Sequence, residues 1–167
     1  MKNIEEYFLY TFTAALLIGY IFASGQAKGD DNLISIQQTG DDFELWIEQI
    51  GHDHTVTAEV TGEGNLIMVS QHESGHTTMM DIIGDTHSVF VMQEYGGSHL
   101  VDLNINNEDN DVSVLQRNMG SHTASISLDG TYGTTLQLDQ DSAFNQSYSL
   151  TQNCLNPKGC SISVLQQ

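Results

Sequence analysis

The sequence predicts an all-β protein, a β-solenoid of six strand–turn–strand repeats whose strands form two stacked parallel sheets. Three observations predict this fold: a repeat of nearly constant length, alternation of apolar and polar residues, and glycine-rich joints. The repeats are marked by glutamines that lie 22, 22, 23, 24 and 26 residues apart, at Gln49, Gln71, Gln93, Gln116, Gln140 and Gln166. Such a period is typical of one structural unit stacked on copies of itself.

Each repeat contains two predicted strands of seven residues, in which positions 1, 3, 5 and 7 face the core because strand side chains alternate. The second strands carry two central aliphatic residues and a closing glutamine, and they begin at Phe43, Asn65, His87, Asn110, Thr134 and Cys160. The first strands begin at Asn32, His54, His76, His99, His122 and Gln146. An antiparallel sandwich also has short strands at this spacing, but it gives no reason for every second strand to look alike.

Two polar ladders are expected to enter this core. Stacked glutamine amides donate to one neighbour and accept from the next, which predicts a self-assembly ladder of Gln38, Gln49, Gln71, Gln93, Gln116, Gln140, Gln152 and Gln166. A second ladder opens the strands at Asn32, His54, Asn65, His76, His87, His99, Asn110 and His122. The glutamine is present on both strands of a repeat only at the two ends of the chain, so the end rungs are expected to govern polymerisation.

The recurring histidines allow three interpretations. The simplest is that histidine takes a hydrogen-bonding place at the turn. A second is a pH switch, since histidine titrates near neutrality. A third is a zinc or copper site. We expect no metal and no cofactor.

The charge balance excludes several function classes. The chain has 22 acidic and four basic residues, a formal charge of −18, which argues against nucleic-acid binding and against adsorption to anionic lipid. The catalytic motifs of hydrolases, metalloproteases and phosphate-binding loops are absent. We therefore do not expect an enzyme.

The ends of the chain predict secretion. Residues 7–23 form an apolar run of 17 that small residues follow, so residues 1–27 are interpreted as a secretory signal and residues 28–167 as the solenoid domain. An uncleaved anchor is the alternative, although 17 residues is near the lower limit for a span. In a secreted chain the close pair Cys154 and Cys160 predicts a disulfide, with a turn at residues 156–159 between them.

The joints carry a more specific pattern. They read Gln49-Ile50-Gly51-x-x-His54-x-Val56 and Gln93-x-x-Gly96-x-x-His99-x-Val101, with strand openers Asn65 and Asn110. This pattern resembles the curlin repeat, Ser-x5-Gln-x-Gly-x-x-Asn-x-Ala-x3-Gln, over about residues 30–167. The chain departs from it where histidine replaces asparagine and where Val60, Ile82, Ile105 and Leu128 replace the second glutamine.

The resemblance implies a curlin-like cross-β solenoid and an extracellular fibre subunit of a Gram-negative bacterium, acting in biofilm matrix and adhesion. It implies self-assembly, a second curlin subunit as partner, and export by curli secretion and assembly machinery. Both the major subunit and the nucleator fit this resemblance.

The pattern also bears on how subunits associate. No amphipathic helix caps either end of the predicted stack, which favours end-to-end growth. Acidic clusters at the joints suggest that protons or calcium control assembly. Exposed apolar residues suggest a contact between fibres or an adhesive patch: Trp46, Met79, Phe90 and Met92. The alternative is a capped, monomeric β-solenoid that binds a cell surface, ligand or metal.

Overall fold

The computed structural model describes residues 21–28, 31–106, 109–130 and 132–167. These residues contain strands and no helix. The nine strands found there are β1 (Ile21–Lys28), β2 (Phe43–His52), β3 (Asn65–Ser74), β4 (Ser88–Gln93), β5 (Asp111–Arg117), β6 (His122–Ile126), β7 (Thr134–Asp141), β8 (Gln146–Leu150) and β9 (Cys160–Gln166). The prediction of an all-β fold is therefore confirmed.

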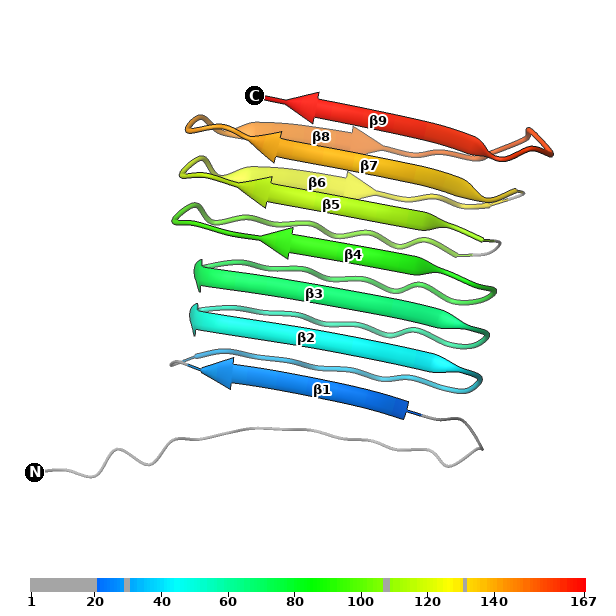
Figure 1. Cartoon of the computed structure of the whole chain (residues 1–167), viewed down its shortest axis with the longest axis horizontal. Coiled ribbons are helices and arrows are strands. Elements are labelled where there is room, and N and C mark those ends of the chain that lie inside the picture. Colours follow the sequence, from blue (N-terminus) through cyan, green and yellow to red (C-terminus); the bar gives the residue numbers. More distant parts are fainter. Residues whose placement is uncertain (1–20, 29–30, 107–108, 131) are drawn as a thin grey trace, which may run out of the picture.

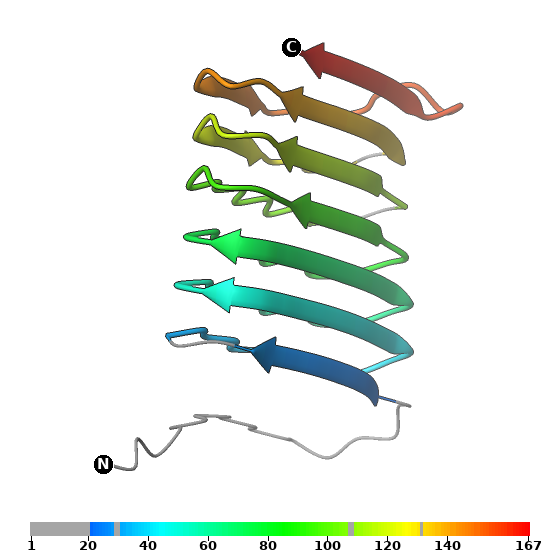
Figure 2. The ribbon, with the colours of Figure 1, turned by 60° about the vertical axis from the view of Figure 1, so that its left-hand side comes forward.

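The strands stack as a parallel β-solenoid of about five turns. Seven of the described strands form one sheet in the order β1-β2-β3-β4-β5-β7-β9, and β6 pairs with β8 in a second layer behind it (Figure 1). Figure 2 shows the same stack turned by 60°, with the chain passing to the second layer at one side of the sheet and returning at the other. The two edge strands of the large sheet, β1 and β9, lie at opposite ends of the stack.

The pairing register is the one that the sequence period predicts. Gln49 pairs with Gln71, and the glutamines at 93, 116, 140 and 166 continue this column strand by strand. Side chains of a strand alternate between its two faces, so a shift of the pairing register by one residue would turn the core-facing side chains of that strand toward solvent. The stack therefore keeps the glutamines above one another from β2 to β9.

The second layer is less regular than predicted. Among the described residues of this layer, only β6 and β8 form a continuous pair. The earlier segments meet through isolated bridges such as Leu33–Thr55 and Thr77–Leu100. Residues 81–83 and 102–106 have positive φ angles between 60° and 148°. This backbone departs from the extended pleat, so a continuous ladder does not form there. The expectation of two complete parallel sheets is thus met in one layer and only in part in the other.

The core lies between the two layers, and each layer contributes a single layer of side chains to it. Aliphatic residues of the large sheet and of the second layer face each other and are at most 1% exposed: Ile67, Val69, Val91, Val114 and Leu138 from the sheet, and Val56, Val101, Ala124 and Ile126 opposite. Because each turn contributes so few residues, stability depends on stacking neighbouring turns.

The predicted signal segment is described only at its end. Residues 1–20 lie outside the described residues, and residues 21–27 make up most of β1, which pairs in parallel with β2. Among the described residues there is no helix long and apolar enough to cross a membrane.

The thin core makes a test of the fold direct. Replacing Leu138, which is fully buried, with alanine should lower the free energy of unfolding by about 2–5 kcal/mol, because a cavity replaces its contacts. Leu66→Ala is the control, since Leu66 is 41% exposed, and its effect should stay within about 0.5 kcal/mol. Urea unfolding followed by circular dichroism measures both, and equal effects would contradict this core assignment.

Candidate functional site

The glutamine column forms one continuous chain of buried hydrogen bonds. The Nε2 atom of Gln49 donates to Oε1 of Gln71 at 2.8 Å, and Gln71 donates to Gln93 at 2.9 Å. The same bond continues from Gln93 to Gln116, from Gln116 to Gln140 and from Gln140 to Gln166, at 2.8–2.9 Å. All five bonds run in one direction, from the rung nearer the N-terminus to the next.

Each of these amides also joins the two layers. The second N–H of Gln71 donates to the carbonyl of Thr55 at 3.1 Å, and that of Gln93 donates to the carbonyl of Thr77 at 3.0 Å. The other rungs make the same bond to Leu33, Leu100, Thr123 and Ser147. A glutamine amide has two donors, and each rung before Gln166 uses one along the stack and one across it.

The ends of the column differ from its middle. Gln49 Oε1 is buried and accepts no hydrogen bond from the described residues, although every later rung accepts one from the glutamine before it. At the other end Gln166 accepts from Gln140 and donates to Ser147. The column therefore begins with an unused acceptor and ends with a donor group.

The predicted end rungs on the first strands do not join this column. Gln38 donates to the carbonyl of Gly40 at 3.0 Å, and Gln152 donates to the carbonyl of Asn153 at 3.4 Å. Both side chains are partly exposed and bond within their own turn. The structure thus separates them from the six rungs that it links together.

The strand-start residues form a second set of hydrogen bonds between successive turns. Asn32 Oδ1 accepts the backbone N–H of His54, Asn65 Oδ1 accepts that of His87, and Asn110 Oδ1 accepts that of Thr134, at 3.0–3.3 Å. A side-chain acceptor in one turn therefore binds the amide that opens the next turn.

Histidine performs the same task as asparagine at these positions. His76 Nδ1 accepts the N–H of His99, and His99 Nδ1 accepts the N–H of His122, at 3.3–3.4 Å. His87 in the large sheet likewise accepts the N–H of Asn110 at 3.3 Å. The simplest interpretation of the histidines agrees with this geometry.

The other ring nitrogen faces a backbone carbonyl. Nε2 of His76 lies 2.8 Å from the His72 oxygen, that of His99 lies 3.1 Å from Glu94, and that of His122 lies 2.7 Å from Arg117. A carbonyl only accepts, so Nε2 of His76 and of His99 must carry the proton while Nδ1 accepts. Both rings are therefore held neutral and in one tautomer.

Burial also favours the neutral form of His76 and His99. His54, His76, His99 and His122 are at most 1% exposed, and consecutive rings stack at centroid distances of 4.8–5.2 Å. Desolvation lowers the pKa of His76 and of His99 from 6.5 to about 4, and it also lowers the pKa of His54. The described residues contain no group of three or more histidine, cysteine or acidic side chains that is arranged to hold a metal ion.

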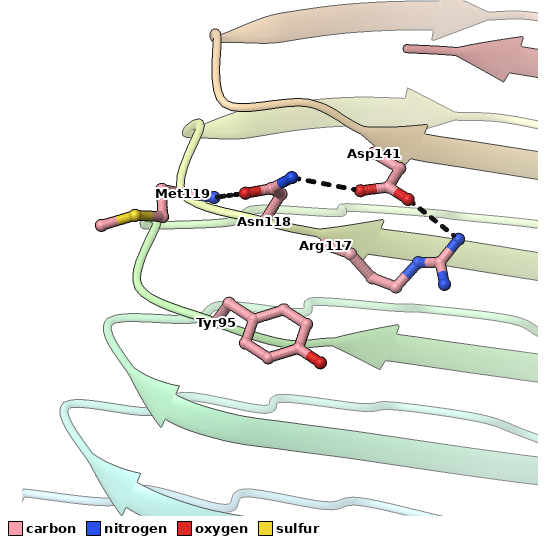
Figure 3. A pocket seen from close by; sticks show the side chains of 5 residues that line it. All are labelled: Tyr95, Arg117, Asn118, Met119 and Asp141. Carbon is pink, nitrogen blue, oxygen red and sulfur yellow. Dashed lines mark hydrogen bonds and ion pairs between the residues drawn. The ribbon is translucent and has the colours of Figure 1, made fainter.

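A shallow pocket of about 350 Å³ lies at the joints that follow β4, β5 and β7 (Figure 3). Arg117, the one arginine in the sequence, lines it and lies 3.1 Å from an oxygen of Asp139 and 3.4 Å from one of Asp141. Figure 3 shows Asp141 also contacting Asn118. Since carboxylates already neutralise the guanidinium, this pocket offers a ligand little uncompensated charge. Sequence reasoning missed this cluster, whose only signal was a lone arginine in an acidic chain.

The two cysteines are joined, with 2.05 Å between the Cys154 and Cys160 sulfurs. The intervening turn is closed by the N–H of Gly159, which donates to the carbonyl of Asn156 at 2.8 Å. The disulfide fastens the last joint immediately before β9 and so anchors the first residue of that edge strand.

The exposed apolar residues that were singled out lie on different layers. Trp46 and Phe90 share one column on the outer face of the large sheet, with Met68 between them in register. Met92 lies on the same face of β4, whereas Met79 belongs to the second layer. A patch made of all four residues therefore does not exist.

Comparison with known proteins adds no assignment: no family model, no curated protein and no solved structure matches the chain.

The glutamine chain is tested by removing one rung. Gln93→Leu leaves Gln116 without its donor and Thr77 without its cross-layer partner, and each buried group left unpaired costs about 1–3 kcal/mol. The control is Gln137→Leu on the exposed face of β7, which should change the free energy of unfolding little. Equal unfolding midpoints for the two variants would contradict the role of the ladder.

The histidine column predicts acid sensitivity. Because the folded pKa of His76 and of His99 lies below 6.5, their stabilising contribution is complete above pH 6.5 and is lost as pH falls through about 4. At about 1.4 kcal/mol per pKa unit, each contributes about 3 kcal/mol to this loss. The double variant His76→Asn/His99→Asn keeps an acceptor in each place and should flatten the pH dependence. Thermal unfolding measured from pH 4 to 7.5 checks this, and parallel curves would contradict it.

Proposed function

We propose that the chain is a secreted, curlin-like structural subunit, built from six sequence repeats, that self-assembles into extracellular amyloid fibres of the curli type. The observation that carries the proposal is the continuous in-register column of glutamine amides, which has a direction and an unused group at its start. Another subunit placed on the stack would extend both the backbone pairing and this chain of amides.

The C-terminal end of the stack supports growth. Among the described strands β9 pairs only with β7, and β8 only with β6, so both present unpaired backbone groups. Their core-facing residues are half-buried where their counterparts in inner turns are fully buried: Tyr148, Leu150, Ile162 and Val164. A second subunit would remove this apolar surface from water, at roughly 25 cal/mol for each Å².

The geometry of such growth favours filaments. A C-terminal end docking on an N-terminal end is a heterologous contact that translates the subunit along the stack, and such contacts do not close. Strands would then repeat at about 4.8 Å along the filament, the spacing of cross-β fibres.

The cellular part of the proposal comes from the resemblance to curlins. It places the subunit at the cell surface, after removal of residues 1–27, as a fibre in biofilm matrix and adhesion. The partners are further copies of the chain, a second curlin subunit, and curli secretion and assembly machinery. In this role the protein needs neither catalysis nor a cofactor, and either position, main fibre component or nucleator, is compatible with it.

One observation favours the second candidate function, a capped monomeric solenoid that binds a surface, ligand or metal. Strand β1 covers the edge of β2 at the N-terminal end, where a second subunit would otherwise dock. With that end closed, the chain would remain a monomer.

The fibre function predicts the behaviour of the chain from Lys28 onward, in which residues 21–27 of β1 are absent. As a fibre subunit it should form thioflavin-positive fibres with a reflection near 4.8 Å. A charge in the docking surface should block growth, so Val164→Asp should prevent fibre formation, while Ser163→Asp on the exposed face of the same strand should not. Circular dichroism checks that both variants fold. A soluble monomer that persists for days, with and without seeds, would contradict the proposal.

A further inference from the structure

Strand β1 completes the large sheet at its N-terminal edge. All eight of its residues pair in parallel with β2, from Ile21 opposite Phe43 to Lys28 opposite Ile50. This is the same relation that links β2 to β3 and each later strand to the next. The edge that a second subunit would need is therefore occupied by a segment of the chain itself.

β1 does not continue the chemistry of the column that it covers. Every other strand of this sheet places a glutamine in the ladder, whereas the residue of β1 opposite Gln49 is Ala27. Alanine has no amide, and Gln49 Oε1 is buried without a donor among the described residues. β1 thus supplies backbone pairing to β2, but it does not supply an amide that donates to Gln49 Oε1.

β1 also covers only part of this end. Phe43, Leu45 and Ile47 of β2 are 2–3% exposed, as in an inner turn. In the second layer of the same turn, Ile34 and Ile36 are only partly buried, like the residues at the opposite end of the stack. The N-terminal end is therefore half closed.

The C-terminal end carries the complementary groups. If the register of β7 and β9 is repeated once more, Cys160 of a second copy pairs with Phe43 and Gln166 pairs with Gln49. The amide of Gln166 would then donate to Gln49 Oε1, in the direction of all five existing bonds. In the second layer Gln146 Oε1 is also buried and accepts no hydrogen bond from the part of the chain that the structure describes. Gln146 occupies the position from which Asn32 accepts the N–H of His54. It would accept the N–H of Asn32 from the next copy.

We propose that β1 is a removable plug: residues 21–28 hold the edge of β2 closed, and their release opens it to β9 of a second copy in this register. The inference rests on the proposed self-assembly and adds a control on it. Since most of β1 belongs to the segment expected to be removed on export, the unprocessed chain is kept from polymerising before it leaves the cell.

While β1 is attached to the chain, effective concentration favours its pairing with β2 over the pairing of a second copy. One edge of β2 has a single set of backbone groups, so β1 and an incoming β9 exclude each other. A strand tethered by a short linker acts at an effective concentration of the order of millimolar. At micromolar protein the attached β1 therefore has about a thousandfold advantage in concentration over a second copy.

The plug closes one end only, and this asymmetry provides the test. The full chain 1–167 has an open β9, so it can add to the β2 end of a fibre, but its own β2 is closed. The test uses fibre seeds that elongate in a solution of the chain from residue 29 onward. Full chain added at one part in ten should slow this elongation, because it closes the β2 end of each fibre to which it adds. Elongation should not stop, because the β9 end still grows. Full chain alone should stay monomeric.

Two variants of the full chain separate the plug from a general effect of the extra residues. Ser24→Pro/Gly25→Pro removes backbone donors from β1 and should release the edge, so that this variant forms fibres and no longer slows elongation. Ser24→Ala/Gly25→Ala keeps the donors and should behave like the full chain. Thioflavin kinetics and light scattering provide the readout.

The outcomes are distinct. The first outcome requires that the chain from residue 29 forms fibres. If the full chain then forms fibres equally fast, or slows elongation no more than the proline variant does, the plug is refuted. The fibre function stands in that case. If both the chain from residue 29 and the proline variant stay monomeric, docking of a second copy on β2 is refuted together with the fibre function.

Discussion

The structure depends on one interaction, the hydrogen bond between glutamine amides of successive turns. Most of these amides are fully buried, and a buried donor or acceptor left unpaired costs about 1–3 kcal/mol. They are satisfied only when each turn lies in register with the next, so that one N–H reaches along the stack and the other reaches across it. The thin aliphatic core supplies most of the burial, and the amides exclude every register but one.

The strand-start positions explain how the chain tolerates variation under this constraint. Asparagine and neutral histidine are unlike in size, yet each presents an acceptor to the backbone N–H of the following turn. What the position requires is an acceptor facing along the stack. The histidines add ring stacking and a dependence on acid that asparagine lacks, because a protonated ring has no acceptor left.

The same ladder gives the molecule a polarity. Because the amide bonds all run one way, one end of the stack lacks a donor and the other carries one, and the two ends are complementary rather than identical. In the self-assembly that we propose, copies of such a molecule would pair head to tail. β1 covers one end without completing the ladder, and we propose that it stops this pairing.

The sequence by itself determined the repeat, the register and the set of residues that face the core. These follow from local rules, since alternation places every second side chain inward and the glutamine spacing aligns Gln49 with Gln71 and its successors. It also pointed to the bond between Cys154 and Cys160, whose separation is short. Only the tertiary structure decided the direction of the amide chain, the tautomers of His76 and His99, the irregular second layer, the separation of Gln38 and Gln152 from the column, and the position of β1 on β2. Each of these depends on which groups of a neighbouring turn lie within hydrogen-bond distance, and that information is not contained in the order of residues within one turn.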